Sequence, residues 1–274
     1  MGGQVPHGKV WMPDMAGTKA KLIPIVCSGL KRSASTWSYN VCRELFQRTL
    51  DPAKVTFVAT YAGDTDKMLE ELARETHGGK PRVALIKAHD LGPATLTGIR
   101  AGRIRNVYTV RDPRDALASM IRFWPPTPDN PFETYLGNFQ RWLMQGETLM
   151  RSGTSLVIRY EDMMDDSAAC IEAVARYLKL PERKQLIARV DAATSVESHR
   201  KIIDRIEEQA EDPDAAFDPT RQLHRRHIDS GEVGRWRRDL SQEQRRRAVV
   251  AFLPWLVSMG YAEEALRAAV EAQA

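Results

Sequence analysis

A loop of small hydroxylated residues and two cations follows the first apolar run of the sequence. It reads Ser28-Gly-Leu-Lys-Arg-Ser-Ala-Ser-Thr-Trp37 and lies between a strand-like run at 22–27 and a helix-like pattern at 35–49. A strand, a short polar loop and a helix together offer free backbone N–H groups and a helix N-terminus to an anion. The loop therefore predicts a phosphate-type site.

The spacing of this loop differs from that of an ATP-binding Walker A loop. Aligned on its first glycine, that motif would place its second glycine, its lysine and its hydroxyl at Ala34, Ser35 and Thr36. The lysine is thus missing, and the cations lie inside the loop, at Lys31 and Arg32. A polar turn that only caps a helix is the alternative interpretation.

A second strand end carries an arginine and a serine. In Tyr108-Thr-Val-Arg-Asp-Pro-Arg-Asp-Ala-Leu-Ala-Ser119, Arg111 leaves the strand and Ser119 lies about two turns into the next helix. A guanidinium and a hydroxyl at that separation could hold one phosphate. A surface Arg–Asp ion pair is the alternative.

A third strand end, Leu85-Ile-Lys-Ala-His89, places Lys87 and His89 on the same side of its strand. Nearby cations should lower the pKa of His89, which keeps the imidazole neutral and able to accept a proton. A packing or capping histidine is the alternative here.

The segments that position these residues alternate between strand and helix. Continuous apolar runs at 22–27, 54–59, 82–87, 105–110 and 155–160 predict buried strands, and helical patterns separate most of them. This alternation favours an α/β fold with a mostly parallel sheet and helices on both faces. Ligands of such sheets bind at the carboxyl ends of the strands, where the three motifs would meet.

Beyond residue 160 the strand signals stop, and the C-terminal third is predicted to be helical. Its patterns span 167–178, 184–190, 197–210 and 242–273, with a break at Gly260. Residues 1–20 are polar and carry Gly and Pro, so we expect a flexible lead over 1–20 and a single domain over 21–274. An acidic stretch at 204–218 precedes a basic one at 221–247 that holds nine arginines against four acids.

The composition is that of an ordinary globular protein. Its 274 residues include 40 Lys+Arg and 36 Asp+Glu, an excess of +4 that does not choose among nucleic acid, membranes and small anions as partners. The spacing of Cys27, Cys42 and Cys170 argues against a disulfide framework or a zinc knuckle. Without a signal-peptide or membrane-length apolar run, we expect a cytoplasmic protein with no stable membrane insertion.

Together, and in this order, the motifs resemble those of the sulfotransferases that use 3′-phosphoadenosine 5′-phosphosulfate (PAPS), over residues 22–240. The resemblance implies a P-loop-NTPase-like fold. It identifies the first loop with the family's 5′-phosphosulfate loop, in which Arg32 would contact the leaving phosphate and Ala34 replaces the usual glycine. The donor-binding residues implied in this loop are Lys31, Arg32, Ser33, Ala34, Ser35, Thr36 and Trp37.

Later motifs extend the resemblance. Arg111 and Ser119 resemble the 3′-phosphate pair, Tyr160 of Tyr160-Glu-Asp resembles a tyrosine near the adenine, and Thr194 a threonine near the same base. The segment Gly231-Glu-Val-Gly-Arg-Trp-Arg237 is similar to a motif that folds over the 3′-phosphate, although Asp-Ser precedes it where many members have Arg-Lys. The residues that would meet the phosphate there are Arg225, Arg226, His227 and Gly231.

The implied reaction is sulfuryl transfer from PAPS to a hydroxyl, or to an amine, leaving 3′,5′-adenosine bisphosphate (PAP) and needing no metal. The resemblance makes His89 the general base, with Arg32 at the leaving phosphate and Lys87 at the sulfuryl oxygens. The expected partner is a small-molecule, carbohydrate or lipid acceptor and not nucleic acid, and a homodimer is left open. Trp124-Pro-Pro-Thr-Pro128 is either a rigid loop or a wall of the acceptor pocket.

Two other functions stay open at this point. A P-loop kinase of a small metabolite would use ATP and magnesium, but its lysine is missing. A non-catalytic protein could bind nucleic acid or another polyanion through the basic stretch at 221–247.

Overall fold

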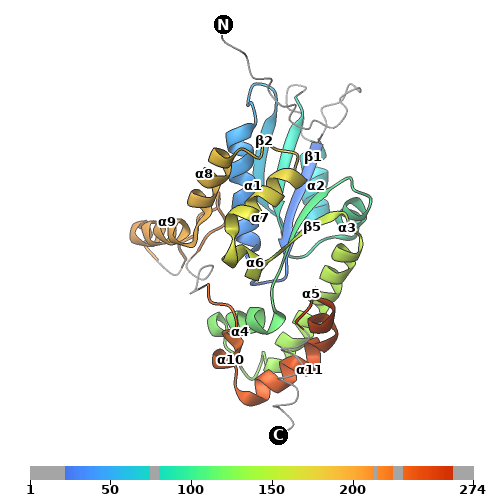
Figure 1. Ribbon diagram of the computed structural model, residues 1–274, viewed down its shortest axis with the longest axis vertical. Coiled ribbons are helices and arrows are strands. Elements are labelled where there is room, and N and C mark those ends of the chain that lie inside the picture. Colours follow the sequence, from blue (N-terminus) through green and yellow to red (C-terminus); the bar gives the residue numbers. More distant parts are fainter. Residues whose placement is uncertain (1–21, 75–79, 213–214, 225–230, 262–274) are drawn as a thin grey trace.

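The computed structural model describes residues 22–74, 80–212, 215–224 and 231–261. Five parallel strands form one sheet in the order β2-β3-β1-β4-β5 (Figure 1). The strands are β1 (Leu22–Gly29), β2 (Thr56–Tyr61), β3 (Arg82–Lys87), β4 (Arg105–Val110) and β5 (Ser155–Arg159). All five predicted strands are present, and β5 ends one residue early because Tyr160 already begins a helix.

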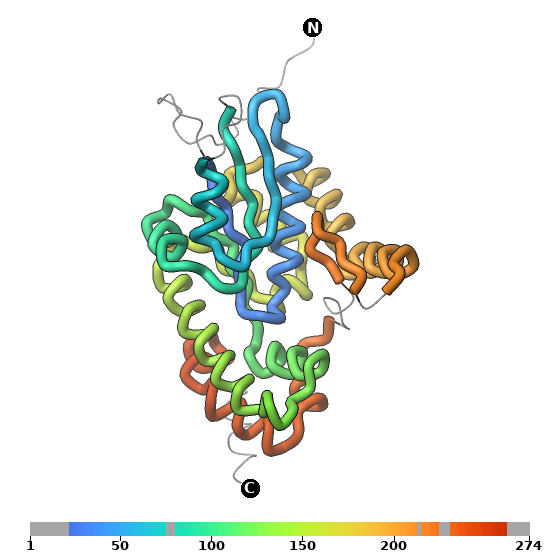
Figure 2. Tube along the Cα trace, turned by 180° about the vertical axis from the view of Figure 1, so that it is seen from behind, coloured from blue at the N-terminus to red at the C-terminus, as the bar shows by residue number. Residues whose placement is uncertain are grey.

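Helices cover both faces of the sheet, as predicted. One hydrophobic core lies under α1 (Ser35–Thr49), α7 (Ser167–Tyr177) and α8 (Lys184–Thr194). The other face is covered by α2 (Thr65–Arg74), α3 (Pro93–Arg100) and α5 (Phe132–Arg151), which are seen from the opposite side in Figure 2. Because both faces are buried, the interior strand β3 is buried at all six residues, which explains the apolar run Val-Ala-Leu-Ile between its two terminal cations.

Short helices follow the sheet in the C-terminal third, which confirms the prediction that this third is helical. They are α6 (Tyr160–Asp165), α7, α8, α9 (Val196–Gln209), α10 (Trp236–Asp239) and α11 (Gln242–Ser258). A capping box of Ser241 and Gln244 begins α11, and Gly260, in the left-handed region with φ +79°, follows its end. The remainder of the helix predicted to reach residue 273 lies outside the described residues.

A group of helices lies beyond the carboxyl ends of the strands. It consists of α4 (Pro113–Phe123), α5, α10 and α11, which pack against one another at one end of the molecule (Figures 1 and 2). This helical group faces the strand ends across the loop that follows β1 and thus closes a space over them. None of the helices in the described ranges is long and apolar enough to cross a lipid bilayer.

Candidate active site

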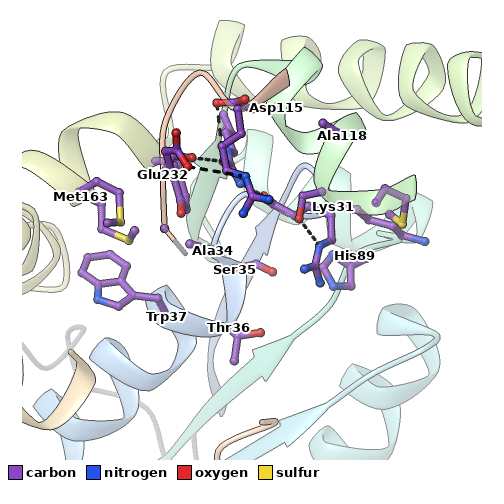
Figure 3. Close-up of a pocket in the computed structure, with 18 of the residues that line it drawn as sticks. Lys31, Ala34, Ser35, Thr36, Trp37, His89, Asp115, Ala118, Met163 and Glu232 are labelled. Atoms are coloured by element: carbon purple, nitrogen blue, oxygen red, sulfur yellow. Dashed lines mark hydrogen bonds and ion pairs between the residues drawn. The ribbon is translucent and has the colours of Figure 1, made fainter. Parts of the chain in front are cut away.

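A cavity of about 590 Å³ opens between the strand ends and the helical group (Figure 3). Its walls come from the loop after β1, the segment after β3, helices α4, α5 and α6, and parts of 194–199 and 223–239. It gathers these predicted residues: Lys31, Arg32, Ala34, Ser35, Thr36, Trp37, His89, Arg111, Ser119, Tyr160, Thr194 and Gly231. Arg225, Arg226 and His227 lie outside the described residues.

The loop after β1 holds an unusual backbone. Arg32 and Ala34 adopt left-handed conformations, with φ of +69° and +71°. A Cβ on Gly29 would come within 2.1 Å of the Thr109 hydroxyl oxygen and 2.7 Å of the Thr109 carbonyl oxygen, so only glycine fits where the loop crosses β4. Ala34 thus adopts the left-handed backbone before α1 although it is not a glycine.

The N-terminus of α1 is free to bind an anion. No side chain caps it, no acidic residue lies in its first turn, and Ser35 and Thr36 of that turn line the cavity. The first N–H groups of a helix have no acceptor within the helix, and the helix dipole is positive there. An anionic group in the cavity would satisfy both.

Ser33 is a buried residue of this loop. The residue is 1% exposed, and its hydroxyl lies 2.5 Å from the carbonyl oxygen of Leu30 and 2.9 Å from that of Thr109. Its backbone N–H donates to the same Leu30 carbonyl. These bonds tie the loop to β4, and Ser33 does not line the cavity. A donor contact from its side chain stays a prediction.

Lys87 is also buried. It is 3% exposed at the end of β3 and does not line the cavity. Burial lowers the pKa of Lys87 to about 8. Its charge acts on the neighbouring His89, and the expected contact with sulfuryl oxygens stays a prediction.

His89 lines the cavity as predicted and has the expected charge state. Burial lowers the pKa of His89 to about 3, and the charges of Lys87 and Lys31 lower it further, against a hydrogen bond with the Gly29 backbone that raises it. Its Nδ1 makes no hydrogen bond to any residue that the structure describes. The imidazole is therefore neutral and keeps a nitrogen that can accept a proton.

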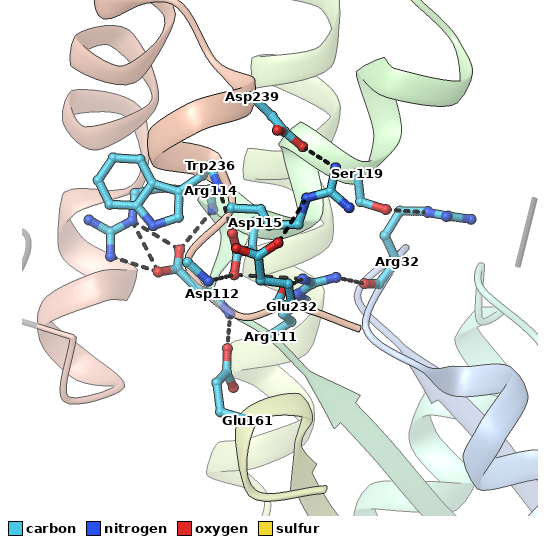
Figure 4. Close-up of polar contacts among 12 residues, drawn as sticks. Arg32, Arg111, Asp112, Arg114, Asp115, Ser119, Glu161, Glu232, Trp236 and Asp239 are labelled. Carbon is cyan, nitrogen blue, oxygen red and sulfur yellow. Dashed lines mark hydrogen bonds and ion pairs between the residues drawn. The ribbon is translucent and has the colours of Figure 1, made fainter. Parts of the chain in front are cut away.

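Arg32 contacts Ser119 across the cavity (Figure 4). The Arg32 Nε donates to the Ser119 hydroxyl oxygen at 3.0 Å, and the guanidinium lies 4.8 Å from the ring centroid of Phe123. The sequence resemblance had assigned the two residues to different phosphates of the donor. The structure brings them together, so an anion near either one would lie near both.

Arg111 is a buried cation at the edge of the cavity. It is 7% exposed, stacks 3.9 Å from the ring centroid of Tyr160, and donates to the backbone carbonyl of Glu232 at 3.1 Å. It also lies 3.6 Å from Asp115. Its Nε makes no hydrogen bond to a described residue. The interpretation of this motif as a surface ion pair is therefore wrong.

Asp115 of α4 binds the backbone of the segment 231–236, which contains Gly231 and Gly234 (Figure 4). Its carboxylate accepts hydrogen bonds from the backbone N–H groups of Gly234, at 2.6 Å, and Trp236, at 2.9 Å. Burial raises the pKa of Asp115, and Arg111 and the two N–H groups oppose that rise. The anchored segment forms the wall that carries Gly231 and Glu232.

A second buried pair supports the same segment. Arg114, fully buried, contacts Asp112 at 2.6 Å and lies 4.1 Å from the ring centroid of Trp236. The Asp112 N–H donates to Glu161, which accepts from Tyr261 with its other oxygen. The sequence argument overlooked these charges, although their clustering around Pro113 at a strand end was the available signal.

The other end of the cavity is apolar and aromatic. Trp37 and Met163 lie at this end, opposite His89 and Lys31 in Figure 3. Gly231, with φ +76°, comes so close to Met164 that a Cβ would lie 2.9 Å from its methyl carbon. Helices α1, α6, α8 and α9 contribute these residues to the cavity lining: Trp37, Tyr160, Met163, Met164, Thr194, Val196 and His199.

His199 is a lining residue that the sequence argument missed. It is 5% exposed, and burial, followed by the charges of Arg221 and Arg43, lowers its pKa to about 4. A lone histidine on a polar helix gives no signal in sequence. Its position became visible only when α9 packed beside the cavity.

Ion pairs balance much of the basic stretch at 221–247. Arg235 lines the cavity and pairs with Asp239. The other pairs are Arg221 with Asp218, Arg238 with Glu232, Arg246 with Glu243, and Arg247 with Glu133. Such pairing weakens the interpretation of this stretch as a polyanion-binding surface. Among the described residues, no group of three or more His, Cys, Asp or Glu side chains could hold a metal ion.

Comparisons with known proteins agree with this geometry. The family model of the sulfotransferase domain matches residues 24–260. Mouse sulfotransferase SULT7A1, solved with PAP, is 20% identical at a TM-score of 0.59, covering 91% of this chain and 89% of that chain. Retinol dehydratase is 17% identical in its complex with retinol and PAP, at a TM-score of 0.59, covering 87% and 82%.

A second retinol dehydratase structure, with androsterone and PAP, is 16% identical at a TM-score of 0.60 and covers 88% of this chain and 82% of that one. No curated protein sequence matches the chain. The solved structures share the fold, and the family match spans nearly all of the described residues. The chain therefore belongs to the sulfotransferase family.

Proposed function

We propose that the protein transfers a sulfuryl group from PAPS to a hydroxyl of a small-molecule or carbohydrate acceptor and releases PAP. The observation that carries the proposal is one cavity that combines an uncapped helix N-terminus, the buried cation Arg111 and the neutral base His89. PAP occupies the related mouse sulfotransferase and retinol dehydratase structures, which supports the same donor here. A cytoplasmic location stays a prediction.

The residues divide the work of the reaction. His89 takes the proton of the acceptor hydroxyl. At the same time the acceptor oxygen forms a bond to sulfur, and the bond between sulfur and the oxygen of the leaving phosphate breaks. Arg32 and the first N–H groups of α1 stabilise the charge that grows on the leaving phosphate. Burial keeps His89 neutral, and the positive charge of Lys87 adds to this effect.

The other groups of the cavity suit the nucleotide. Arg111 offers charge to a second phosphate, the group that distinguishes PAPS from ATP. Ser119 accepts a hydrogen bond from Arg32, so the two can contact one anion together. The aromatic end with Trp37 and Tyr160 offers surfaces on which a purine can stack. This division of the cavity requires no metal ion at any step.

Donor choice is tested by thermal unfolding with PAP in the presence of EDTA and, separately, with Mg-ATP. PAP at 100 times its Kd should stabilise the protein by about 2.7 kcal/mol. Stabilisation by Mg-ATP alone would instead favour the kinase alternative.

The base is tested by His89→Ala with labelled PAPS at saturation and a panel of hydroxyl acceptors. We expect turnover to fall about 10²-fold or more, because a general base is lost. The affinity for PAP, measured by calorimetry on the same variant, should remain that of the wild type. Wild-type turnover by the variant would exclude His89 as the base.

A further inference from the structure

Lys31 extends from the phosphate-binding loop toward the acceptor side of the cavity. Its ammonium lies 4.4 Å from the ring centroid of Trp142 on α5. Both residues line the cavity. The charge of Lys31 therefore lies at the wall of the cavity that α5 forms.

The ion pair that Lys31 makes is weak. Its ammonium lies 3.9 Å from Asp90, at the outer limit of an ion pair, and the two side chains are 31% and 69% exposed. Exposed pairs of this kind contribute little to stability. A ligand anion could replace Asp90 beside Lys31 at small cost.

The charge of Lys31 also reaches the base. Lys31, Lys87 and Arg32 all lower the pKa of His89. An acceptor hydroxyl placed at His89 would bring a neighbouring substituent of the same molecule within the field of Lys31. That field favours an anionic substituent and opposes a protonated amine.

Aromatic walls surround this position. Trp142 and Trp124 line the cavity, and Trp124 keeps 40% of its surface exposed. The Tyr135 hydroxyl donates to the Trp124 carbonyl at 2.9 Å and accepts from the Asn130 amide at 2.8 Å. Trp124 of the Trp-Pro-Pro-Thr-Pro loop is thus held by a hydrogen bond and forms part of the pocket wall, and the flat rings of Trp124 and Trp142 suit a ring compound.

We propose that the preferred acceptor is a ring compound that carries its hydroxyl together with an anionic group, such as a carboxylate, and that Lys31 binds the anionic group. This inference rests on the proposed function, because it places the acceptor hydroxyl at His89. It narrows the acceptor class from hydroxyl compounds in general to acidic ones.

The test compares kcat/KM for 4-hydroxyphenylacetate and its neutral amide, and for the 3-hydroxy isomers of both, with labelled PAPS. The wild type should prefer an acid over its amide by about tenfold or more, the effect of one charged hydrogen bond. Lys31→Gln should abolish this preference, and Lys31→Arg should keep it. Asp90→Asn should keep or increase it, because a competing anion is removed.

A matched control is Lys67→Gln on α2. Lys67 also makes a 3.9 Å ion pair, with Glu71, but lies outside the cavity, so the preference should not change. The sequence resemblance counts Lys31 among the donor-binding residues, so the PAP affinity of Lys31→Gln is measured as well. It should fall less than the kcat/KM of the variant for the acids does.

The inference would be overturned if the wild type did not prefer either acid over its amide, or if Lys31→Gln kept that preference. It would also be overturned if Lys31→Gln lost PAP affinity by as much as it lost turnover with both the acids and the amides. The last result would assign Lys31 to the donor. A wild type that binds no PAP and sulfates no acceptor would instead refute the proposed function itself.

Discussion

At the scale of single residues, Ala34 is the clearest departure from expectation. It stands where related loops have glycine, yet it adopts the left-handed backbone, with φ +71° and ψ +30°. A residue with a Cβ is destabilised there by about 1–2 kcal/mol. The bonds of Ser33 to Leu30 and Thr109 hold the loop in this shape despite the strain.

Replacing Ala34 by glycine should relieve this strain. Glycine also makes the unfolded chain more flexible, which takes back about 0.4–1 kcal/mol, so we expect a net gain of about 0.5 kcal/mol. Urea unfolding measures the difference. The control is Ala173→Gly inside α7, which should lose about 1 kcal/mol. A loss at Ala34 as large as the control would contradict the strain argument.

At the scale of elements, the site depends on how the segment 231–236 is held on α4. Asp115 satisfies two N–H groups of this segment and lies beside Arg111, while Trp236 packs on the buried Arg114. These contacts join residues about 120 positions apart in the chain. The segment 231–236 is therefore held in place by α4, and the two together form one wall of the cavity.

The variant Asp115→Asn tests this anchor. Its amide has one acceptor oxygen and no charge, so one N–H bond weakens and Arg111 loses its charge partner. We expect PAP affinity to fall about tenfold or more and stability to fall by about 2 kcal/mol. Calorimetry with PAP and urea unfolding measure the two effects.

Glu243→Gln is the matched control for Asp115→Asn. Glu243 pairs with Arg246 on the surface of α11, so both quantities should change little. Equal effects of the two substitutions would mean that Asp115 does not anchor the segment.

At the scale of the whole molecule, one buried histidine, His199, and one partly buried histidine, His89, line a cavity with several cations. The folded pKa values of His89, about 3, and His199, about 4, lie below the 6.5 of an ordinary histidine. At a pH between the lowered pKa values and 6.5, the unfolded chain binds more protons than the folded one. Stability should therefore fall as the pH drops from 6.5 toward 4.

The size of this acid sensitivity can be measured on His199→Gln. Each buried neutral histidine contributes a slope of up to about 1.4 kcal/mol per pH unit in this window. Urea unfolding at several pH values between 4 and 6.5 should show the slope of the variant smaller by about that amount. An unchanged slope would mean that His199 titrates normally in the folded protein.

The sequence by itself determined the sheet, its flanking helices and the three motifs at the strand ends. Strands buried on both faces are rich in apolar residues, and a run such as Val-Ala-Leu-Ile at 83–86 is readable without a structure. Helix α1 was predicted with its observed bounds because its apolar spacing is regular. The same arguments predicted correctly that parallel strand ends bring Arg32, His89 and Arg111 to one cavity.

Only the tertiary structure decided which polar side chains face that cavity. Ser33 and Ser35 are alike in sequence, but the left-handed turns at Arg32 and Ala34 direct Ser33 to β4 and leave Ser35 at the cavity. Lys87 lies below the surface, while Lys31 reaches across to Trp142. These outcomes depend on close packing between distant segments, and local spacing carries no information about it.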